Sequence, residues 1–531
     1  MSVAPVAPEL WLEWDGRRLA WNGDAAKSHC SEVHFCIDGV IFERIAVNSA
    51  MGRCERDFAF SPSGRDEIEF SLHAADSSMI GEPWRVLYGH AARVGANAWE
   101  GAPRAMQPMP TLPLPKWTGA STTAIVVPIF NLPDLVRHCI AAVLRWTRGQ
   151  VRLILIDDAS TDPGVATLLA NYEHCGGIVV RRNPHNLGYT RSTNLGIELA
   201  GDADVVLLNS DTQVGPRWLD VLRQVAYSDA AIGTVTAVSD NAGAFSVPEL
   251  EQYCPIPAQW TLPMVQRALL QNAGGCLPEL PTGNGFCMFV KRAMLDRVGV
   301  LDADAFPSGY GEENDLCQRG EHAGFRHVIA GNVFVQHERS ASFGEARRAA
   351  LGAQGMQVLR SRYPDYEAKV GATLFSFARR VLDYRVRRIY ADRDGVYAVL
   401  PPRPRIAFAV DESGPSVQAL AAALQSHYEC FVLRVDGKDI ESHLGQWLAS
   451  LAIELVQVLS AQAGDVGLMR AAAHVGVPVL DSSADAQLQA MCNSVDSSDP
   501  EASVQLAACC TALYEACWRD SASFAEAGAE P

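Results

Sequence analysis

Two hydrophobic patterns divide the chain. Before about residue 98, short runs such as residues 67–72 alternate polar and apolar side chains, and this period of two predicts half-buried antiparallel strands. From about residue 120, runs such as residues 124–127 and 205–208 are apolar throughout, which is typical of a parallel sheet that helices cover on both faces. We therefore expect a β-sandwich accessory domain over residues 1–98 and an α/β domain after it.

Composition shifts mark the remaining boundaries. Five prolines within residues 99–119 exclude helix interiors and paired strands, so this segment is a predicted linker. The α/β pattern then covers residues 120–344, and a helical connector is expected over residues 345–400. A second set of apolar runs predicts an acidic, Rossmann-like α/β domain over residues 401–531. Its first turn lacks G-x-G-x-x-G, which argues against nucleotide binding there.

Within the connector, residues 370–390 combine an apolar pattern with several arginines. Such a helix can lie on an anionic membrane surface, and a helix packed between domains with solvated arginines is the alternative. No apolar run reaches the roughly 18 residues that span a bilayer, and no basic patch precedes an apolar core at the start. We therefore expect a cytoplasmic protein, with a peripheral position on the inner face of the membrane if the helix binds lipid.

Composition limits the class of protein. Of the 531 residues, 48% are hydrophobic and 20% are charged, which excludes wholesale disorder. The formal net charge of −17 has the wrong sign for a surface that neutralises phosphates, so nucleic acid is not an expected partner. The 14 cysteines form no C-x-x-C pair, and we interpret them as reduced thiols rather than as a zinc site.

Polar residues follow the apolar runs of the α/β domain. Asp157 and Asp158 end one run, and residues 209–211 end another. Ligands bind beyond the carboxyl ends of parallel strands, and neighbouring carboxylates repel each other unless a cation or ligand donors compensate them. The pattern therefore predicts a ligand site, although acids that cap the following helices would produce part of the same pattern.

A second acidic group lies further along the chain. Glu312, Glu313 and Asp315 open a predicted helix, where in isolation they could simply favour the helix dipole. A short apolar strand then ends at His337, an imidazole that could bind a divalent metal together with Asp211.

Seven motifs, in their order, resemble glycosyltransferase family 2, the inverting enzymes of GT-A fold, over about residues 121–340. They are VVPIFN, IDDASTD, NLGYTRSTNLGI, LLNSDTQV, TGNGFCMFVKR, GYGEENDLCQR and VFVQH. The resemblance implies a mostly parallel sheet with flanking helices and leaves the two flanking domains outside the family.

The resemblance also implies roles for particular residues. It assigns Asp211 and His337 to Mn²⁺ or Mg²⁺, with Asn209 where the family's D-x-D motif has its first acid. Glu313 stands at the position of the catalytic base, and Asp315 is a second candidate. The nucleotide sugar is expected to bind Pro128, Asn131, Asp158, Asn186, Gly188, Arg191, Asn209, Ser210 and Asn284.

We therefore expect a metal-dependent inverting glycosyltransferase in surface polysaccharide synthesis. Its donor would be a UDP- or dTDP-linked sugar, and its acceptor a glycan or a lipid-linked saccharide. An inactive scaffold that binds glycans or nucleotide sugars is the alternative. Nucleotidyl transfer is disfavoured because residues 130–133 offer no glycine-rich basic loop, and glycoside hydrolysis because no pair of flanking carboxylates stands out.

Overall fold

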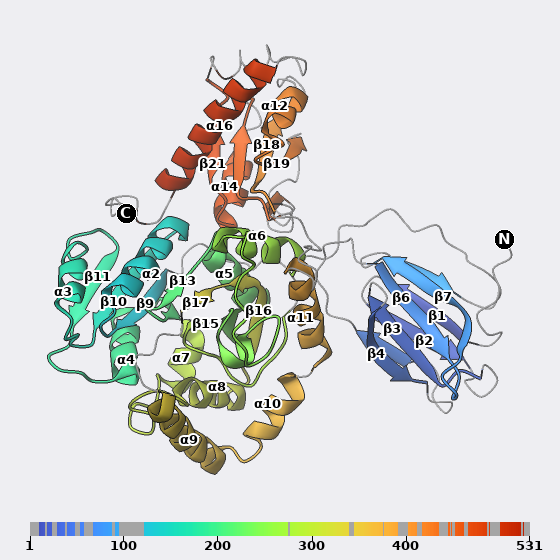
Figure 1. The fold of residues 1–531 in the computed structure, drawn as a ribbon, viewed down its shortest axis with the longest axis horizontal. Helices are drawn as coiled ribbons and strands as arrows, with labels where there is room; N and C mark the ends of the chain where they lie inside the picture. Colours follow the sequence, from blue (N-terminus) through green and yellow to red (C-terminus); the bar gives the residue numbers. More distant parts are fainter. Residues whose placement is uncertain are drawn as a thin grey trace.

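The structure of the chain is a computed structural model (Figure 1). It describes residues 10–15, 18–23, 29–37, 40–47, 54–57, 67–87, 91–94, 122–273, 277–338, 345–374, 376–390, 402–410, 417–434, 444–445, 448, 452–460, 466–485, 488, 500–521 and 524. The linker predicted over residues 99–119 lies outside these residues.

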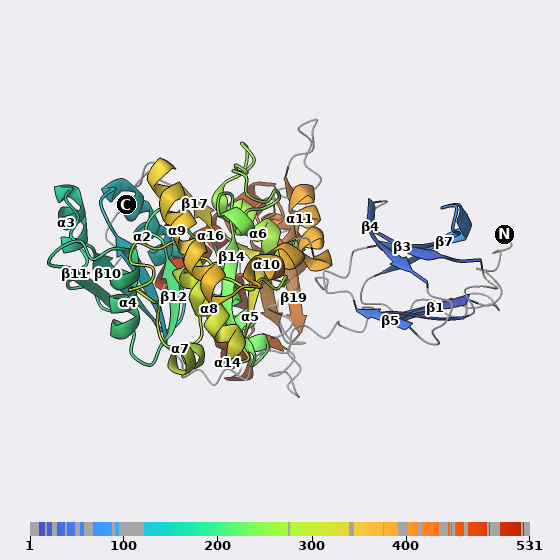
Figure 2. The ribbon, with the colours of Figure 1, turned by 90° about the horizontal axis from the view of Figure 1, so that it is seen from below.

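The N-terminal segment forms two four-stranded antiparallel sheets, ordered β5-β2-β1-β8 and β4-β3-β6-β7. Figure 2 shows them as two layers. Val33, Phe35, Phe70 and Leu72 are buried, so every second residue of β3 and of β6 points into a core. The strands are β1 (Leu10–Asp15), β2 (Arg18–Gly23), β3 (Glu32–Ile37), β4 (Val40–Ala46), β5 (Cys54–Asp57), β6 (Glu67–His73), β7 (Met79–Leu87) and β8 (Ala91–Val94).

The central domain contains a seven-stranded sheet ordered β11-β10-β9-β12-β15-β14-β16, which is parallel except at β15. Helices cover both of its faces, so the predicted α/β class is confirmed. The strands are β9 (Thr123–Ile129), β10 (Val151–Asp157), β11 (Ile178–Arg182), β12 (Asp204–Leu208), β14 (Ile232–Val238), β15 (Cys287–Val290) and β16 (Arg326–Phe334). The short strands β13 (Thr212–Gln213) and β17 (Gln336–His337) pair separately.

Alternate residues of the central strands pack into two hydrophobic cores, one on each face of the sheet. Val127 and Leu155 pack on one face, while Val126 and Ile154 pack on the other. This two-sided burial explains why these strands are apolar throughout. The covering helices are α2 (Pro133–Trp146), α3 (Pro163–Ala170), α5 (Trp218–Ser228) and α6 (Leu262–Asn272) on the first face, and α4 (Tyr189–Leu199), α7 (Arg292–Val298) and α8 (Glu312–His322) on the second.

A C-terminal α/β unit rests on the central domain at α5 and α6 (Figure 1). Its parallel sheet has the order β19-β18-β20-β21. The guanidinium of Arg217 donates to the carbonyls of Ile453 and Val475, and Arg267 forms a bidentate pair with Glu454 at 2.7 and 3.0 Å. The elements are β18 (Arg405–Val410), α12 (Val417–Leu424), β19 (Glu429–Arg434), β20 (Leu455–Val458), α14 (Val466–His474), β21 (Val479–Asp481) and α16 (Pro500–Asp520).

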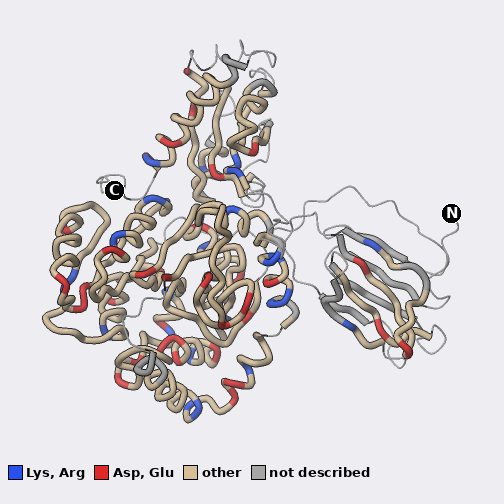
Figure 3. Tube along the Cα trace, viewed as in Figure 1, with Lys and Arg blue, Asp and Glu red and all other residues tan. Residues whose placement is uncertain are grey.

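The connector contains α9 (Glu345–Arg362), α10 (Tyr366–Leu374) and α11 (Phe377–Ile389). Basic residues lie along α11 (Figure 3), but its apolar residues Val381, Leu382, Val386 and Ile389 are buried inside the protein. Arg379 is also buried and donates to the carbonyls of Ala244 and Ser246.

Of the two interpretations of residues 370–390, the structure therefore favours a helix packed between domains. The buried side chains Val381, Leu382, Val386 and Ile389 argue against the membrane interpretation of α11. Among the described residues, no helix is both long enough and apolar enough to cross a membrane.

Candidate active site

The carboxyl ends of β10, β9 and β12 lie side by side, since these strands are consecutive in the sheet. Pro128 lies in β9 beside Ile156 of β10, and Asn131 and Asp158 follow the two strands. Residues 209–211 follow β12 at the same edge. The topology therefore gathers most of the predicted nucleotide-binding residues at one edge of the sheet.

Asn131 joins the segment after β9 to the loop after β10. Its side-chain oxygen accepts hydrogen bonds from the backbone amides of Thr161, at 2.8 Å, and Asp162, at 3.0 Å. Asn131, Leu132 and Ala159 all adopt positive φ angles, between 56° and 62°. Three such non-glycine residues at one edge indicate a backbone that the surrounding contacts hold in a strained shape, as is common at binding sites.

Asp158 holds the loop that precedes α4. One carboxylate oxygen accepts from the amide nitrogen of Leu187 at 2.8 Å, and the other from that of Gly188 at 2.9 Å. The side chain of Asn186 donates to the Asp158 carbonyl at 3.3 Å. Gly188 has φ +85°, and a Cβ atom there would lie 2.5 Å from the Pro307 carbonyl oxygen. The structure thus brings together Asp158, Asn186 and Gly188, and this close approach requires glycine at position 188.

Arg191 is separated from this group. Its guanidinium pairs with Asp304 at 2.8 Å, and both side chains are exposed. Arg191 also lines a cavity of about 540 Å³ together with Asn194, Arg292 and Val300. The guanidinium of Arg191 thus pairs with the loop before α8, whereas Asn186 and Gly188 contact Asp158.

Asp211 and His337 meet because β13 pairs with β17, which brings Thr212 opposite His337. The Nε2 atom of His337 lies 3.3 Å from Oδ1 of Asp211. Its Nδ1 atom lies 3.0 Å from the carbonyl oxygen of Asn241. A carbonyl only accepts hydrogen bonds, so Nδ1 carries the hydrogen and the Nε2 lone pair of a neutral ring points to Asp211.

This arrangement fits a divalent cation. An imidazole nitrogen whose other nitrogen is fixed by a carbonyl, beside a carboxylate oxygen, is a recurrent pair of ligands for Mn²⁺. Within the described residues, no group of three or more His, Cys, Asp or Glu side chains could hold a metal. Asp211 and His337 would therefore be two protein ligands, and a bound ligand or water would supply the others.

Glu313 lies in the first turn of α8. Its Oε1 atom accepts a hydrogen bond from the amide nitrogen of Gly285 at 3.0 Å. A Cβ atom at residue 285 would collide with the Tyr189 hydroxyl and would lie 2.5 Å from the Glu313 carboxylate. Asn284 closes the same turn by accepting from the amide of Phe286 at 3.1 Å. Glycine at position 285 therefore allows Tyr189 and Glu313 to approach each other.

The segment at Gly285 also reaches the Asp211–His337 pair. The ring of Phe286 stacks on that of His337, with centroids 5.5 Å apart, and the Phe286 carbonyl accepts from the amide of Asn209 at 3.0 Å. Two consecutive residues thus contact Glu313 on one side and His337 on the other. The acid in α8 and the candidate metal ligands therefore belong to one site.

Glu312 is a site residue to which the sequence assigned no role. It is 2% exposed, and its carboxylate accepts from the amide of Gly311 at 2.9 Å. Burial raises the pKa of Glu312 well above its ordinary value, and the neighbouring Glu313, to which it hydrogen-bonds, adds to the rise in pKa. No Lys, Arg or His of the described chain forms an ion pair with it. These surroundings favour the protonated form of Glu312, which can donate a hydrogen bond to Glu313.

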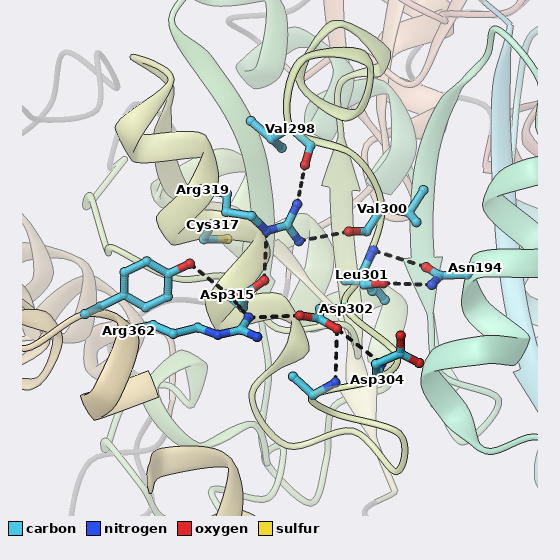
Figure 4. A network of polar contacts seen from close by, with 12 residues as sticks. Asn194, Val298, Val300, Leu301, Asp302, Asp304, Asp315, Cys317, Arg319 and Arg362 are labelled. Carbon is cyan, nitrogen blue, oxygen red and sulfur yellow. Dashed lines mark hydrogen bonds and ion pairs between the residues drawn. The ribbon is translucent and has the colours of Figure 1, made fainter. Parts of the chain in front are cut away.

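Asp315 has a different environment from Glu313. Its carboxylate is completely buried and accepts from Arg319 at 2.8 Å, from Arg362 at 2.7 Å and from the Tyr363 hydroxyl at 2.9 Å (Figure 4). Because these donors surround it, an acceptor hydroxyl cannot reach Asp315 in this arrangement. Of the two candidate bases, only Glu313 is partly accessible.

Together, the fold and the site define an α/β protein with a candidate ligand site at the strand ends, which the Gly285–Phe286 segment connects to the acidic start of α8. Residues 124–299 match the sequence model of glycosyl transferase family 2. This segment is a glycosyltransferase family 2 domain, which confirms the resemblance over the five motifs up to residue 292. The motifs at residues 309–319 and 333–337 lie beyond the matched residues.

Curated relatives match about a quarter of the chain, at 23% and 26%. The glycosyltransferase GlyG of Streptococcus pneumoniae serotype 4 is 26% identical over 125 residues, which are 23% of this chain and 42% of GlyG. The O-antigen biosynthesis protein RfbC of Myxococcus xanthus is 29% identical over 140 residues, 26% of this chain and 11% of RfbC. The chain thus covers less than half of either protein.

Among solved structures, the mannosyltransferase PcManGT of Pyrobaculum calidifontis, in complex with GDP-Man and Mn²⁺, has 18% identity and a TM-score of 0.35. The match covers 49% of this chain and 69% of that one. At that TM-score, the likeness supports no conclusion about this site.

Proposed function

We propose that the protein is an inverting glycosyltransferase in which Glu313 is the catalytic base. The observation that carries this proposal is the pair of consecutive residues that joins the two halves of the site. Gly285 binds Glu313, and Phe286 stacks on His337. A base and a pair of metal ligands in one site suit transfer from a nucleotide sugar to a hydroxyl. The base takes up the proton of the hydroxyl, and the metal faces the leaving group.

In the proposed reaction, Glu313 takes the proton of the acceptor hydroxyl. The acceptor oxygen forms a bond to the anomeric carbon of the donor sugar, and the bond from that carbon to the diphosphate oxygen breaks. The nucleoside diphosphate leaves with the electron pair of the broken bond. Because attack and departure occur on opposite faces in a single displacement, the anomeric configuration inverts.

Asp211 and His337 would hold Mn²⁺ or Mg²⁺ in this reaction. A bound divalent ion would supply positive charge to stabilise the departing diphosphate. The residue two positions before Asp211 is Asn209, so a single carboxylate would face the ion from this segment. We infer that the protein binds the ion more tightly with the donor diphosphate than without it.

We propose a UDP- or dTDP-linked sugar as the donor and a glycan or lipid-linked saccharide as the acceptor, in the assembly of a surface polysaccharide. The support is the family 2 domain and the role in O-antigen biosynthesis that the name of RfbC states. A cytoplasmic location remains part of this proposal.

The test uses the full-length protein with Mn²⁺ and a panel of UDP- and dTDP-sugars, and it measures released nucleoside diphosphate. We expect E313Q to lower turnover by roughly 10²- to 10⁴-fold. E321Q is the matched control, because Glu321 lies on the same helix and pairs with Lys369. Equal turnover in E313Q and E321Q would remove the base assignment. Donor binding without any release of nucleotide would favour the inactive scaffold instead.

A further inference from the structure

The connector helices contact the segment that carries Glu313, and both lie beyond residues 124–299, which match the family model. The strongest contact is the ion-pair network of Figure 4, which is centred on the buried Asp315, two residues after Glu313. Arg362, at the end of α9, and Tyr363, which follows it, both contact one carboxylate oxygen of Asp315. Arg319 of α8 occupies the other oxygen.

Arg362 joins the two ends of one loop. Besides Asp315, its Nη1 atom contacts Asp302 at 2.9 Å. Asp302 itself accepts from the amides of Asp304 and Ala305, so it shapes the start of the loop. Arg319 fixes the preceding chain by donating to the carbonyls of Val298 and Val300. The segment from residue 298 to 315 is therefore tied at both ends through buried or half-buried charged groups.

The backbone within this segment needs such support. Gly309, Tyr310 and Gly311 have φ angles of +85°, +67° and +144°, and Glu312 follows immediately. Glycine adopts a positive φ readily, but Tyr310 is not a glycine, and such a residue keeps a positive φ only where surrounding contacts hold it. Helix α9 supplies part of that structure, because Gly355 packs so closely on the Tyr310 carbonyl that a Cβ atom would collide with it.

A second contact from the connector reaches the same helix start. The hydroxyl of Tyr366, a buried residue of α10, contacts the side chain of Asn314 and also hydrogen-bonds to Thr282. Asn314 is the residue after Glu313, and Thr282 belongs to the loop that leads to Gly285. Tyr366 of the connector thus contacts both the helix that carries Glu313 and the loop whose Gly285 amide binds the Glu313 carboxylate.

From these contacts we propose that Arg362 and Tyr363 are positioning residues, which hold the loop and the first turn of α8 so that Glu313 faces the acceptor. This inference rests on the proposed function of Glu313. It makes the connector part of the site in which Glu313 acts.

The chain offers a matched control. Arg360 also lies on α9, two residues before Arg362, but it forms an exposed bidentate pair with Glu367 of α10 and does not contact the loop. R360Q therefore removes an ion pair between α9 and α10 without changing the network around Asp315. R362K is a partial restoration, because a single nitrogen of Arg362 contacts both carboxylates and an ammonium could do the same.

In the full-length protein, we expect R362Q and Y363F to lower kcat by roughly ten- to a hundredfold while the KM for the donor changes little, since small displacements of a base are costly. R360Q should leave both constants unchanged, and R362K should retain more activity than R362Q. In the D315N background, R362Q should cause a smaller loss than it does alone. Equal kcat values for R362Q and R360Q would overturn the proposal.

Hydrogen–deuterium exchange separates this proposal from the proposed function. If the wild-type protein transfers no sugar from any donor, the proposed function fails, but exchange over residues 302–319 still tests the contacts. Faster exchange there in R362Q than in R360Q is expected. Identical exchange in the two variants would overturn the positioning role, whatever the activity.

Discussion

The Nε2 atom of His337 lies 3.3 Å from Oδ1 of Asp211, while the opposite ring nitrogen of His337 is held by the Asn241 carbonyl. We therefore expect H337A and D211A each to weaken Mn²⁺ binding at least about tenfold. Calorimetric titration with Mn²⁺ in the presence of UDP measures this. H138A, which removes an exposed histidine of α2, is the control. Mn²⁺ affinity in H337A equal to that in H138A would contradict the assignment.

If Glu312 is protonated and donates to Glu313, two substitutions of Glu312 should lower turnover to different extents. A Gln side chain can still donate to Glu313, so E312Q should keep most of the turnover. E312A removes a hydrogen bond to a charged group, which contributes about 1.5–3 kcal/mol, and should lower kcat roughly ten- to a hundredfold. Steady-state assays on the two variants distinguish the cases. A loss in E312Q as large as that in E312A would show that Glu312 must ionise.

Stability should depend on pH through the same carboxyl. The pKa of Glu312 is raised in the folded protein above its ordinary 4.5, so its contribution is complete below that value and is lost as the pH rises through the folded pKa. E312Q does not titrate at this position. We expect the difference in unfolding free energy, E312Q minus wild type, to increase as the pH rises from about 4.5 towards neutrality. Denaturant melts across that range measure it, and a constant difference would contradict the raised pKa.

Gly285 and Gly371 should respond differently to alanine. A Cβ atom at residue 285 would lie 2.5 Å from the Glu313 carboxylate, whereas one at residue 371 of α10 meets nothing within 4 Å. G285A should therefore displace the base and lower kcat by roughly a hundredfold. G371A should leave activity unchanged and stabilise the protein by about 0.5–1 kcal/mol, because glycine is unfavourable in a helix. Assays and melts on both variants provide the comparison.

The Arg267–Glu454 pair should stabilise the contact between the central and C-terminal units. Both side chains are largely buried, so R267M leaves the Glu454 carboxylate without its partner, which typically costs about 3–5 kcal/mol. The exposed Arg145–Glu515 pair is the control, and R145M should cost less than about 1 kcal/mol. Equal shifts of the unfolding midpoint in the two variants would contradict this account.

Local patterns in the sequence predicted much of the central domain. Continuous apolar runs identified strands buried on both faces, and the residues after them, including Asn131, Asp158 and Asp211, do lie at one edge of the sheet. These inferences succeeded because they depend on neighbouring residues and on a rule that applies to all parallel sheets.

Features that depend on distant partners could not be read in this way. In the sequence, Asp315 and Glu313 are equally good candidates for the base. In the structure, Arg362, 47 positions after Asp315, covers the Asp315 carboxylate. Arg191 pairs across the surface with Asp304, and which of the consecutive residues Glu312 and Glu313 is buried depends on how α8 packs. The basic stripe of α11 resembled a membrane-binding helix because the sequence does not reveal that its apolar side packs inside the protein.

The contact between Gly188 and Pro307 has a kinetic consequence. The loop held by Asp158 and the loop that leads to Glu312 are in contact at Gly188 and the Pro307 carbonyl. The contact is between backbone atoms, because Gly188 has no side chain. A donor that settles against the first loop must therefore also restrain the second, where the acceptor is to be activated. We expect compulsory-order kinetics, with the nucleotide sugar binding first and the nucleoside diphosphate leaving last.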